Sequence, residues 1–516
     1  MSRKKLPIGI QTFAKIRSDD YYYVDKTGFA QRLVDGGKAY FLSRPRRFGK
    51  SLFIDTLAEM FAGNKALFEG LACYDTWDWD MVYPVVRISF GAGRVCDPDE
   101  LAQRIRDQLQ ANAARLGLDP LREKYVSGMF VDLIQGAEQL HGQRVVVLVD
   151  EYDKPILDNL NDTETALTMR DGLRDLYSVV KDQDAHIKFV FLTGVSKFSK
   201  VSIFSGLNNL NDITIDRRYS ALCGYTEHDV DTVFAAELAG LDRDRIRNWY
   251  NGYNWTGVAV YNPFDLLLLF DKRQFRPYWF ETGTPTFLID TLTRRGFFLP
   301  DLEALTASES LLSTFDVGDL TTEALLFQTG YLTIAAWQDI GEDIYYTLGY
   351  PNREVRSALT SALLDRLTGD PRGAVEKRRD IYLALTAGDL GALEKLFTAL
   401  FAGIPSDWHR KNHIADYEGY YASVFYACIA ASGLAAWPED SSSHGRVDLT
   451  VRLPGHIYLF EFKVVACVPD GGALAQIRAA GYADKYRADG TPIHLVGVEF
   501  SRERRSIVGF DTQTIP

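Results

Sequence analysis

The sequence predicts an α/β protein of several domains, with a parallel-sheet core in the N-terminal half, a helical middle region and a smaller α/β domain at the C-terminal end. Its 516 residues exceed the roughly 250 to 300 residues at which a single hydrophobic core stops growing. Apolar runs followed by helical patterns are typical of a parallel sheet, and a hairpin pattern stands near the C-terminal end. We therefore expect domains at residues 1–215, 216–375 and 376–516.

The overall charge and composition exclude several classes of protein. A net charge of -12 gives no general attraction to nucleic acid or to an anionic membrane, so any nucleic-acid contact requires a local basic surface. The 5 scattered cysteines lack metal-ligand spacing, which favours reduced thiols in the cytosol. No signal peptide is recognisable, and the most apolar stretch, 420–437, suits a buried helix better than a span of about 20 residues. We expect a cytoplasmic protein without a membrane segment.

The first strand and helix of the N-terminal half enclose a loop with phosphate-binding character. Residues 39–42 form a short apolar run, and apolar positions from 52 to 61 recur at helical spacing. The loop between them ends in Gly49, Lys50 and Ser51, the last three positions of the Walker A pattern, whereas Arg44 stands where that pattern has its first glycine. Strand, loop and helix are the context that a phosphate loop requires.

The residue types at the end of this loop match the chemistry of a triphosphate. Gly49 allows the backbone to approach the phosphates, Lys50 neutralises the β and γ phosphates, and the Ser51 hydroxyl ligates Mg²⁺. Arg46 and Arg47 either add positive charge near the phosphates or are solvated loop residues.

An acidic strand end supplies the second half of an ATP site. Five apolar residues, 145–149, precede Asp150 and Glu151, as in a central parallel strand. Asp150 is expected to hold Mg²⁺ through its hydration shell, and Glu151 to position the attacking water. The alternative is a plain strand followed by a helix-capping acid, but the paired Gly-Lys-Ser motif favours the ATP site.

A third strand, 187–193, ends in polar residues at the same edge of the expected sheet. Thr193 or Ser196 either senses the γ-phosphate or is an ordinary turn hydroxyl. Arg217 and Arg218 are either phosphate-sensing or surface residues. With Glu151 as the catalytic residue, the predicted nucleotide site comprises Arg47, Phe48, Gly49, Lys50, Ser51, Asp150 and Thr193.

Several separated motifs in order resemble the bacterial AAA-ATPase-like family, which has the same Arg-Pro-Arg-Arg-Phe version of the phosphate loop. The resemblance covers about residues 6–215 and implies a helical lid and linker afterwards, where aromatic clusters suggest packing and no catalytic group. Residues 374–401 are predicted to form two amphipathic helices. The motifs stand at 6–13, 23–27, 44–51, 148–155 and 192–198.

A hairpin near the C-terminal end carries two acids and a lysine. Strands are predicted on either side of the turn Pro454-Gly455, and strand alternation places Glu461 and Lys463 on one face, with Asp448 beside them. Asp448 and Glu461 suit Mg²⁺, and Lys463 would orient or help deprotonate the attacking water. The alternative is a surface ion pair. The apolar neighbours of Glu461 favour the metal site, since an unpaired acid on a buried strand is costly.

This arrangement resembles the PD-(D/E)XK nuclease superfamily, over about residues 380–513. The resemblance implies an α/β restriction-endonuclease-like domain, with Glu418 as an additional metal ligand and Gln476 as a residue that supports the site. Asp448, Glu461 and Lys463 are all present, so an active enzyme is expected.

Together these patterns predict a bacterial P-loop ATPase whose cofactors are ATP and Mg²⁺, and which controls a Mg²⁺-dependent nuclease acting on DNA or RNA. The alternative is a nucleotide-binding regulatory module that holds nucleic acid or a partner without cleaving it. No membrane partner is expected, and assembly into a homo-oligomer stays open.

Overall fold

The structure is a computed structural model that describes residues 3–197, 210–281, 286–294, 297–313, 315–316, 319–369, 371–404, 418–442 and 445–516. Two compact units make up the chain. Unit 1 comprises residues 1–279 and 306–347, and unit 2 comprises residues 280–305 and 348–516. Parts of the middle region 216–375 belong to each unit, and the domain boundaries predicted from the sequence stay predictions.

Unit 1 contains a parallel five-stranded sheet, as predicted, in the order β2-β3-β4-β1-β5. Because β4 lies between β1 and β3, the phosphate loop after β1 and the acids after β3 open at the same edge, two strands apart. All five residues before Asp150 are buried, which explains the unbroken apolar run. The strands are β1 (Ala39–Ser43), β2 (Val85–Ser89), β3 (Val145–Asp150), β4 (Ile187–Gly194) and β5 (Asn211–Asp212).

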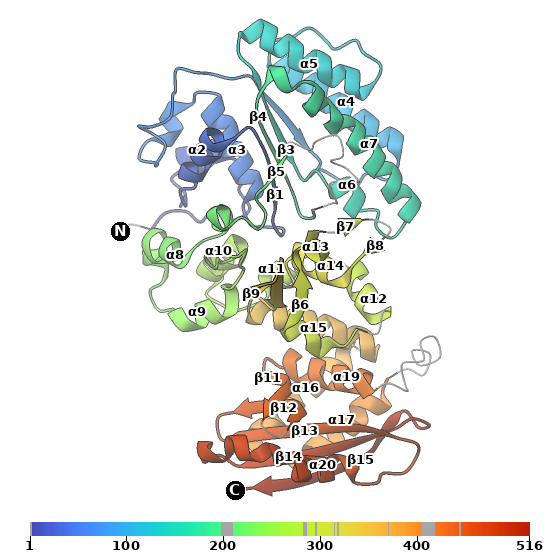
Figure 1. The fold of residues 1–516 in the computed structure, drawn as a ribbon. Coiled ribbons are helices and arrows are strands. Elements are labelled where there is room, and N and C mark those ends of the chain that lie inside the picture. Colours follow the sequence, from blue (N-terminus) through green and yellow to red (C-terminus); the bar gives the residue numbers. More distant parts are fainter. Residues whose placement is uncertain are drawn as a thin grey trace. The chain divides into compact units, whose positions relative to one another are not determined.

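Helices cover both faces of this sheet. In Figure 1, α2 and α3 lie on one side, and α4, α5 and α7 pack together on the other. The helix predicted after the phosphate loop is confirmed as α3. The helices are α1 (Phe13–Ser18), α2 (Thr27–Gly36), α3 (Lys50–Phe61), α4 (Pro98–Arg115), α5 (Val126–His141), α6 (Lys154–Leu157) and α7 (Thr163–Asp182).

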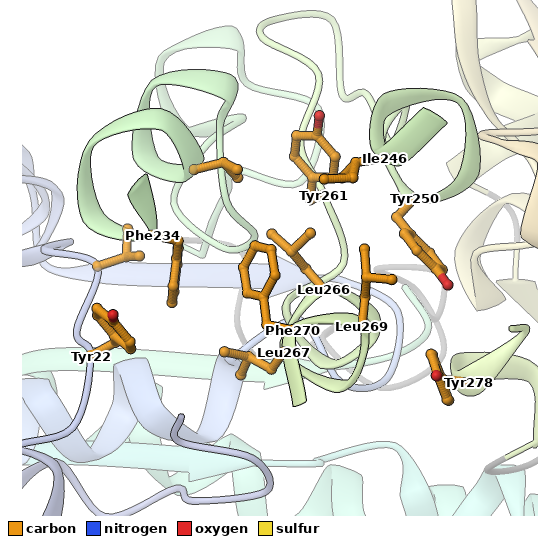
Figure 2. Packing of buried hydrophobic residues seen from close by; sticks show 12 residues of the cluster. Tyr22, Phe234, Ile246, Tyr250, Tyr261, Leu266, Leu267, Leu269, Phe270 and Tyr278 are labelled. Atoms are coloured by element: carbon orange, nitrogen blue, oxygen red, sulfur yellow. The ribbon is translucent and has the colours of Figure 1, made fainter. Parts of the chain in front are cut away.

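A second apolar cluster joins the start of the chain to the helices that follow the sheet. Leu266 and Phe270 of α10 pack with Ile246 and Tyr250 of α9 and with Tyr22 from the N-terminal segment (Figure 2). The N-terminal segment is therefore fixed to the helices that follow the parallel sheet. These helices are α8 (Glu227–Val233), α9 (Arg243–Tyr250), α10 (Pro263–Lys272) and α11 (Tyr278–Glu281).

The middle region also contains small sheets that its sequence pattern did not predict. One has the order β6-β10-β9, and β7 pairs with β8. Six of the eight β9 residues are exposed, so this strand lacks the alternation that would have marked it. The elements are β6 (Leu305–Ser308), α13 (Glu309–Ser313), β7 (Phe315–Asp316), β8 (Asp319–Leu320), α14 (Thr322–Thr329), β9 (Thr333–Ile340) and β10 (Asp343–Gly349).

Unit 2 is built on a mixed sheet in the order β11-β12-β13-β14-β15, in which only β13 and β14 are parallel. The predicted hairpin is confirmed as β12 and β13, and the predicted pair of amphipathic helices as α16 and α17. The elements are α12 (Thr286–Arg294), α15 (Arg353–Thr368), α16 (Pro371–Ala387), α17 (Leu390–Ala402), α19 (Glu418–Ala431), β11 (Ala436–Ser442), β12 (Gly445–Leu453), β13 (His456–Val465), α20 (Gly472–Ala480), β14 (Ile493–Ser501) and β15 (Ser506–Ile515).

The two faces of β13 pack against different helices. Phe460 and Phe462 contact Phe425 of α19, whereas Leu459 packs with Leu474 and other residues of the α20 side. Alternation along the strand therefore directs Glu461 and Lys463 to the α20 side.

Among the described residues, no helix combines the length and the apolar character needed to cross a membrane.

Candidate functional site

The phosphate loop joins the buried strand β1 to α3. Gly49, the residue before α3, has φ 92°, a left-handed conformation that glycine adopts without strain. Arg47 has φ 69°, which is uncommon for a residue with a side chain. No side chain caps the first turn of α3, so its N–H groups remain available to an anion.

Lys50 lies beside the predicted acids. Its side chain is buried, and Nζ donates to the carbonyl oxygens of Arg44 and Pro45 at 2.9 Å each. Burial lowers the pKa of Lys50, while the charges of Asp150 and Glu151 act in the opposite direction. The structure thus places Lys50 within electrostatic reach of Asp150, the last residue of β3, and of Glu151, which follows it.

The donor set at this edge fits a divalent cation. Asp150 Oδ1 is buried and accepts no hydrogen bond from the described residues. A buried carboxylate oxygen without a donor is costly, and Mg²⁺ is a ligand that would satisfy it. Ser51, the second residue of α3, is half-buried next to Lys50.

Glu151 is placed by an unusual backbone conformation. Its φ is 51°, again in the left-handed region, and its Oε2 would lie 3.3 Å from a Cβ added at Gly91. The side chain therefore extends toward the chain that leaves β2, the neighbour of β3. A strained residue directly after Asp150 is consistent with a functional constraint.

The side chain of Arg44 is directed toward the chain that follows the sheet. Its side chain is 0% exposed, donates to the carbonyl oxygens of Thr214 (2.8 Å) and Tyr219 (3.3 Å), and lies over the Trp255 ring at 4.0 Å. Burial lowers its pKa to about 10. The residue that departs from the Walker A pattern therefore fastens the loop to the chain that follows the sheet.

Aromatic residues enclose the rest of the loop. Phe48 is buried against Tyr253 and Trp255, with ring centroids 4.7 and 5.6 Å away. The Trp279 Nε1–H group donates to the Arg46 carbonyl oxygen at 3.1 Å. The side chains of Arg46 and Arg47 are exposed, and Arg47 lies 4.9 Å from the Phe264 ring centroid.

The polar residues after β4 have mainly backbone partners. The Thr193 hydroxyl donates to the Leu42 carbonyl oxygen at 2.8 Å. Ser196 is buried, and its Oγ has no hydrogen bond from the described residues. Of the two candidate arginines, Arg218 pairs with Asp216 at 2.6 Å on the surface, and Arg217 is exposed.

Asp153 is a buried acid that the sequence reasoning did not assign. Its carboxylate accepts from the backbone N–H groups of Val195 (3.0 Å) and Ser196 (2.5 Å). Burial raises its pKa to about 6, although the N–H groups and Lys50 act in the opposite direction. Asp153 connects the chain after β3 to the chain after β4. In the sequence, only its position three residues after Asp150 could have drawn attention to it.

The second candidate site lies on β12 and β13 of unit 2. Asp448 Oδ2 accepts from the Phe462 N–H group at 2.7 Å, one residue from Glu461 and from Lys463. Glu461 is 2% exposed, and Gln476 of α20 donates to its Oε1. The two predicted carboxylates are therefore brought together, and Gln476 contacts one of them.

Close packing of α20 makes this arrangement possible. Gly497 lies opposite Glu461 in the parallel pair of β13 and β14, and a Cβ there would collide with the backbone of Leu474. A Cβ at Gly472 would lie 2.9 Å from Lys463 Nζ, so the lysine reaches the start of α20. Glycine at both positions lets the helix lie against the site.

Tyr482 is a further residue at this site. Burial raises its pKa, and the charges of Glu461 and Asp448 raise it further. Its hydroxyl would lie 3.1 Å from a Cβ at Gly445, the first residue of β12. The Tyr482 phenol therefore lies within electrostatic reach of both Asp448 and Glu461. The sequence could not indicate this, because the two acids stand on β12 and β13, away from Tyr482 in the chain.

The donor set here fits Mg²⁺, which keeps several waters and takes one or two protein carboxylates. In the described part of the chain, no group of three or more His, Cys, Asp or Glu residues gathers that could hold a metal. The side chain of Glu418, the predicted additional ligand, lies outside the described residues.

Comparison with known proteins gives two family matches. A model described as a predicted AAA-ATPase matches residues 7–204, and a model of the PD-(D/E)XK nuclease superfamily matches residues 416–510. The chain is 62% identical, over 100% of both chains, to an uncharacterized protein in the vnfD 5' region of Azotobacter chroococcum mcd 1. No solved structure matches the chain.

Proposed function

The chain belongs to the family of proteins that join an AAA-ATPase-like domain to a PD-(D/E)XK nuclease superfamily domain, and on this basis we propose that it hydrolyses ATP to control a Mg²⁺-dependent nuclease acting on DNA or RNA in a bacterial cytoplasm. The observation that carries the proposal is the presence of two complete residue sets, Lys50 with Asp150 and Glu151, and Asp448 with Glu461 and Lys463.

In the ATPase half, Lys50 binds the triphosphate and Glu151 orients the attacking water. Lys50 now donates to two loop carbonyl oxygens, so a triphosphate replaces these bonds with stronger charge-assisted ones. Glu151 extends from the strand end beside Asp150, whose oxygen is available to Mg²⁺ with Ser51.

In the nuclease half, Asp448 and Glu461 would hold the metal, and Lys463 would orient the attacking water. Mg²⁺, when bound, supplies positive charge that stabilises the scissile phosphate. Gln476 fixes one oxygen of Glu461, and the Phe462 N–H group fixes one oxygen of Asp448. Each acid is thereby held in a set orientation.

Control passes through the chain connection between the two units. Trp279 holds the Arg46 carbonyl oxygen of the phosphate loop and is the last residue of the first segment of unit 1. The helix that carries it, α11, continues into unit 2 at Phe280. A change of the loop on nucleotide binding therefore acts on the element that leads to the nuclease domain.

The ATPase half is tested by replacing Lys50. Lys50→Ala removes the ammonium group from the phosphates and should lower the rate of ATP hydrolysis by at least about a hundredfold. A loss of this size is typical when one group that stabilises charge in the transition state is removed. The control is Lys65→Ala, an exposed lysine of the same unit, which should keep the parent rate. Equal rates for parent and Lys50→Ala would remove this half of the proposal.

The nuclease half is tested on a panel of single-stranded, double-stranded and branched DNA and RNA with Mg²⁺, with and without ATP. Parent protein should cleave at least one substrate, Lys463→Ala should stop the cleavage, and Lys395→Ala, an exposed lysine on α17, should not. Binding of the panel without cleavage would instead support the regulatory module, which the net charge of -12 slightly favours.

A further inference from the structure

A short turn rich in arginine links the last two strands of unit 2. Arg502, Glu503, Arg504 and Arg505 connect β14 to β15, and the first three of these residues are exposed. The turn carries three positive charges and one negative charge in a chain whose net charge is -12. We call residues 502–505 the arginine turn.

Backbone hydrogen bonds hold the arginine turn to the end of β13. Arg502 N donates to the Val465 carbonyl oxygen at 2.9 Å, and Glu503 N donates to the Ala466 carbonyl oxygen at 3.2 Å. The turn is therefore attached to the strand that carries Glu461 and Lys463, two residues beyond the lysine.

Ser501 fixes the conformation of the turn. Its hydroxyl accepts from the Arg504 N–H group at 3.0 Å and donates to the Ala466 carbonyl oxygen at 3.1 Å. Its carbonyl oxygen accepts from the Arg505 N–H group at 2.8 Å. The backbone that presents the arginines is thus ordered before any ligand binds, which lowers the entropic cost of binding.

The nearby carboxylates do not neutralise the end of this turn. Glu499, the buried acid next to Lys463 in the sheet, accepts from the N–H groups of Asp470 (2.8 Å) and Ala473 (3.2 Å). Among the described residues, no ion pair joins Arg504 or Arg505 to an acid. Their charge is therefore available to an external anion.

The distance along the strand gives the position of such an anion. Arg502 follows Glu499 by three residues, so the arginine turn begins about 10 Å beyond the level of Lys463. One DNA strand rises about 3.4 Å per nucleotide, so this distance corresponds to roughly three nucleotides.

We propose that the arginine turn binds the phosphodiester backbone of the nucleic acid, about two to four nucleotides from the bond held at Asp448, Glu461 and Lys463. This inference rests on the proposed nuclease function. The contact is electrostatic and independent of base sequence, and it supplies the local basic surface that the acidic chain needs.

Binding is measured apart from cleavage, by fluorescence anisotropy of labelled single-stranded and double-stranded DNA and RNA in EDTA over a range of KCl concentrations. The test variant is Arg504→Ala/Arg505→Ala. The matched control is Arg379→Ala/Lys395→Ala, which removes two exposed charges from α16 and α17 of the same unit. Thermal unfolding of both variants checks that the fold is kept.

The test variant should bind about tenfold more weakly at low salt, and its slope of log affinity against log salt should fall by about 1.8 for a duplex or about 1.4 for a single strand. The control should match the parent. Unchanged affinity and slope, an equal loss in the control, or a parent that binds none of the probes would each overturn the inference. Binding by the parent without cleavage in Mg²⁺ would leave the arginine turn supported and remove the proposed nuclease function.

Discussion

At the scale of single residues, two buried charged side chains of unit 1 connect separate loops through hydrogen bonds to backbone groups. Arg44 joins the phosphate loop to residues 214–219, and Asp153 joins the chain after β3 to the chain after β4. A buried charge without partners costs several kcal/mol, so each of these side chains persists because backbone groups surround it. Both Arg44 and Asp153 lie at the sheet edge that carries the predicted ATP site.

Asp153 should make the stability of unit 1 depend on pH. Because burial raises its pKa from 3.8 to about 6, the folded state holds the proton more tightly than the unfolded state does. The resulting stabilisation is fully present below about pH 4 and is lost as pH rises through about 6, a change of about 3 kcal/mol at most. Urea unfolding of the parent and Asp153→Asn across this range measures the difference.

The amide of Asp153→Asn keeps an acceptor for the Ser196 N–H group but does not titrate. The free energy of unfolding of the parent, relative to this variant, should therefore decrease from acid to neutral pH. Parallel pH profiles for the two proteins would show that Asp153 does not take up a proton in this range.

At the scale of elements, we expect α11 to respond to changes in the phosphate loop. It is four residues long. The Trp279 N–H group donates to the Arg46 carbonyl oxygen of the loop, and the Trp279 ring lies 5.3 Å from the Tyr331 ring centroid. Tyr278 of the same helix is buried in the apolar cluster of α9 and α10, so Trp279 is the residue through which we expect a shift of the loop to act on this helix.

Trp279→Phe keeps an aromatic ring and removes the N–H donor to the Arg46 carbonyl oxygen. The ratio of cleavage with ATP to cleavage without ATP should fall toward one, since a bond worth roughly 1 kcal/mol no longer links the loop to α11. Trp337→Phe, at an exposed tryptophan of β9, is the control. A full ATP effect in Trp279→Phe would place the coupling elsewhere.

At the scale of the whole molecule, two compact units carry one candidate site each. A ligand that binds only the folded form stabilises the unit that contains its site, by about 2.7 kcal/mol at a hundred times its dissociation constant. The same chain can therefore show different responses in its two halves.

Differential scanning calorimetry at a constant Mg²⁺ concentration should resolve two transitions, and addition of a non-hydrolysable ATP analogue should raise the midpoint of only one. Lys50→Ala should lose this shift and keep the second transition unchanged, because Lys50 belongs to unit 1. A single transition that moves as a whole would show that the units unfold together.

The sequence was sufficient for elements whose signal is local. The apolar run before Asp150 predicted β3, the spacing after Ser51 predicted α3, and the turn at Pro454-Gly455 predicted the hairpin. The exposed strand β9 escaped prediction because it has no buried face. Asp153 and Tyr482 escaped assignment because their partners lie on other strands.

By itself the sequence determined the family resemblance and the α/β class and predicted the two sets of candidate site residues, because hydrophobic periodicity and motif spacing act over a few residues. Only the tertiary structure decided that Arg44 binds backbone carbonyl oxygens, and that the arginine turn is attached at Val465 and Ala466, just beyond the strand position of Lys463. The physical reason is that burial and hydrogen-bond partners come from segments far apart in the chain, and only the packed fold brings those segments together.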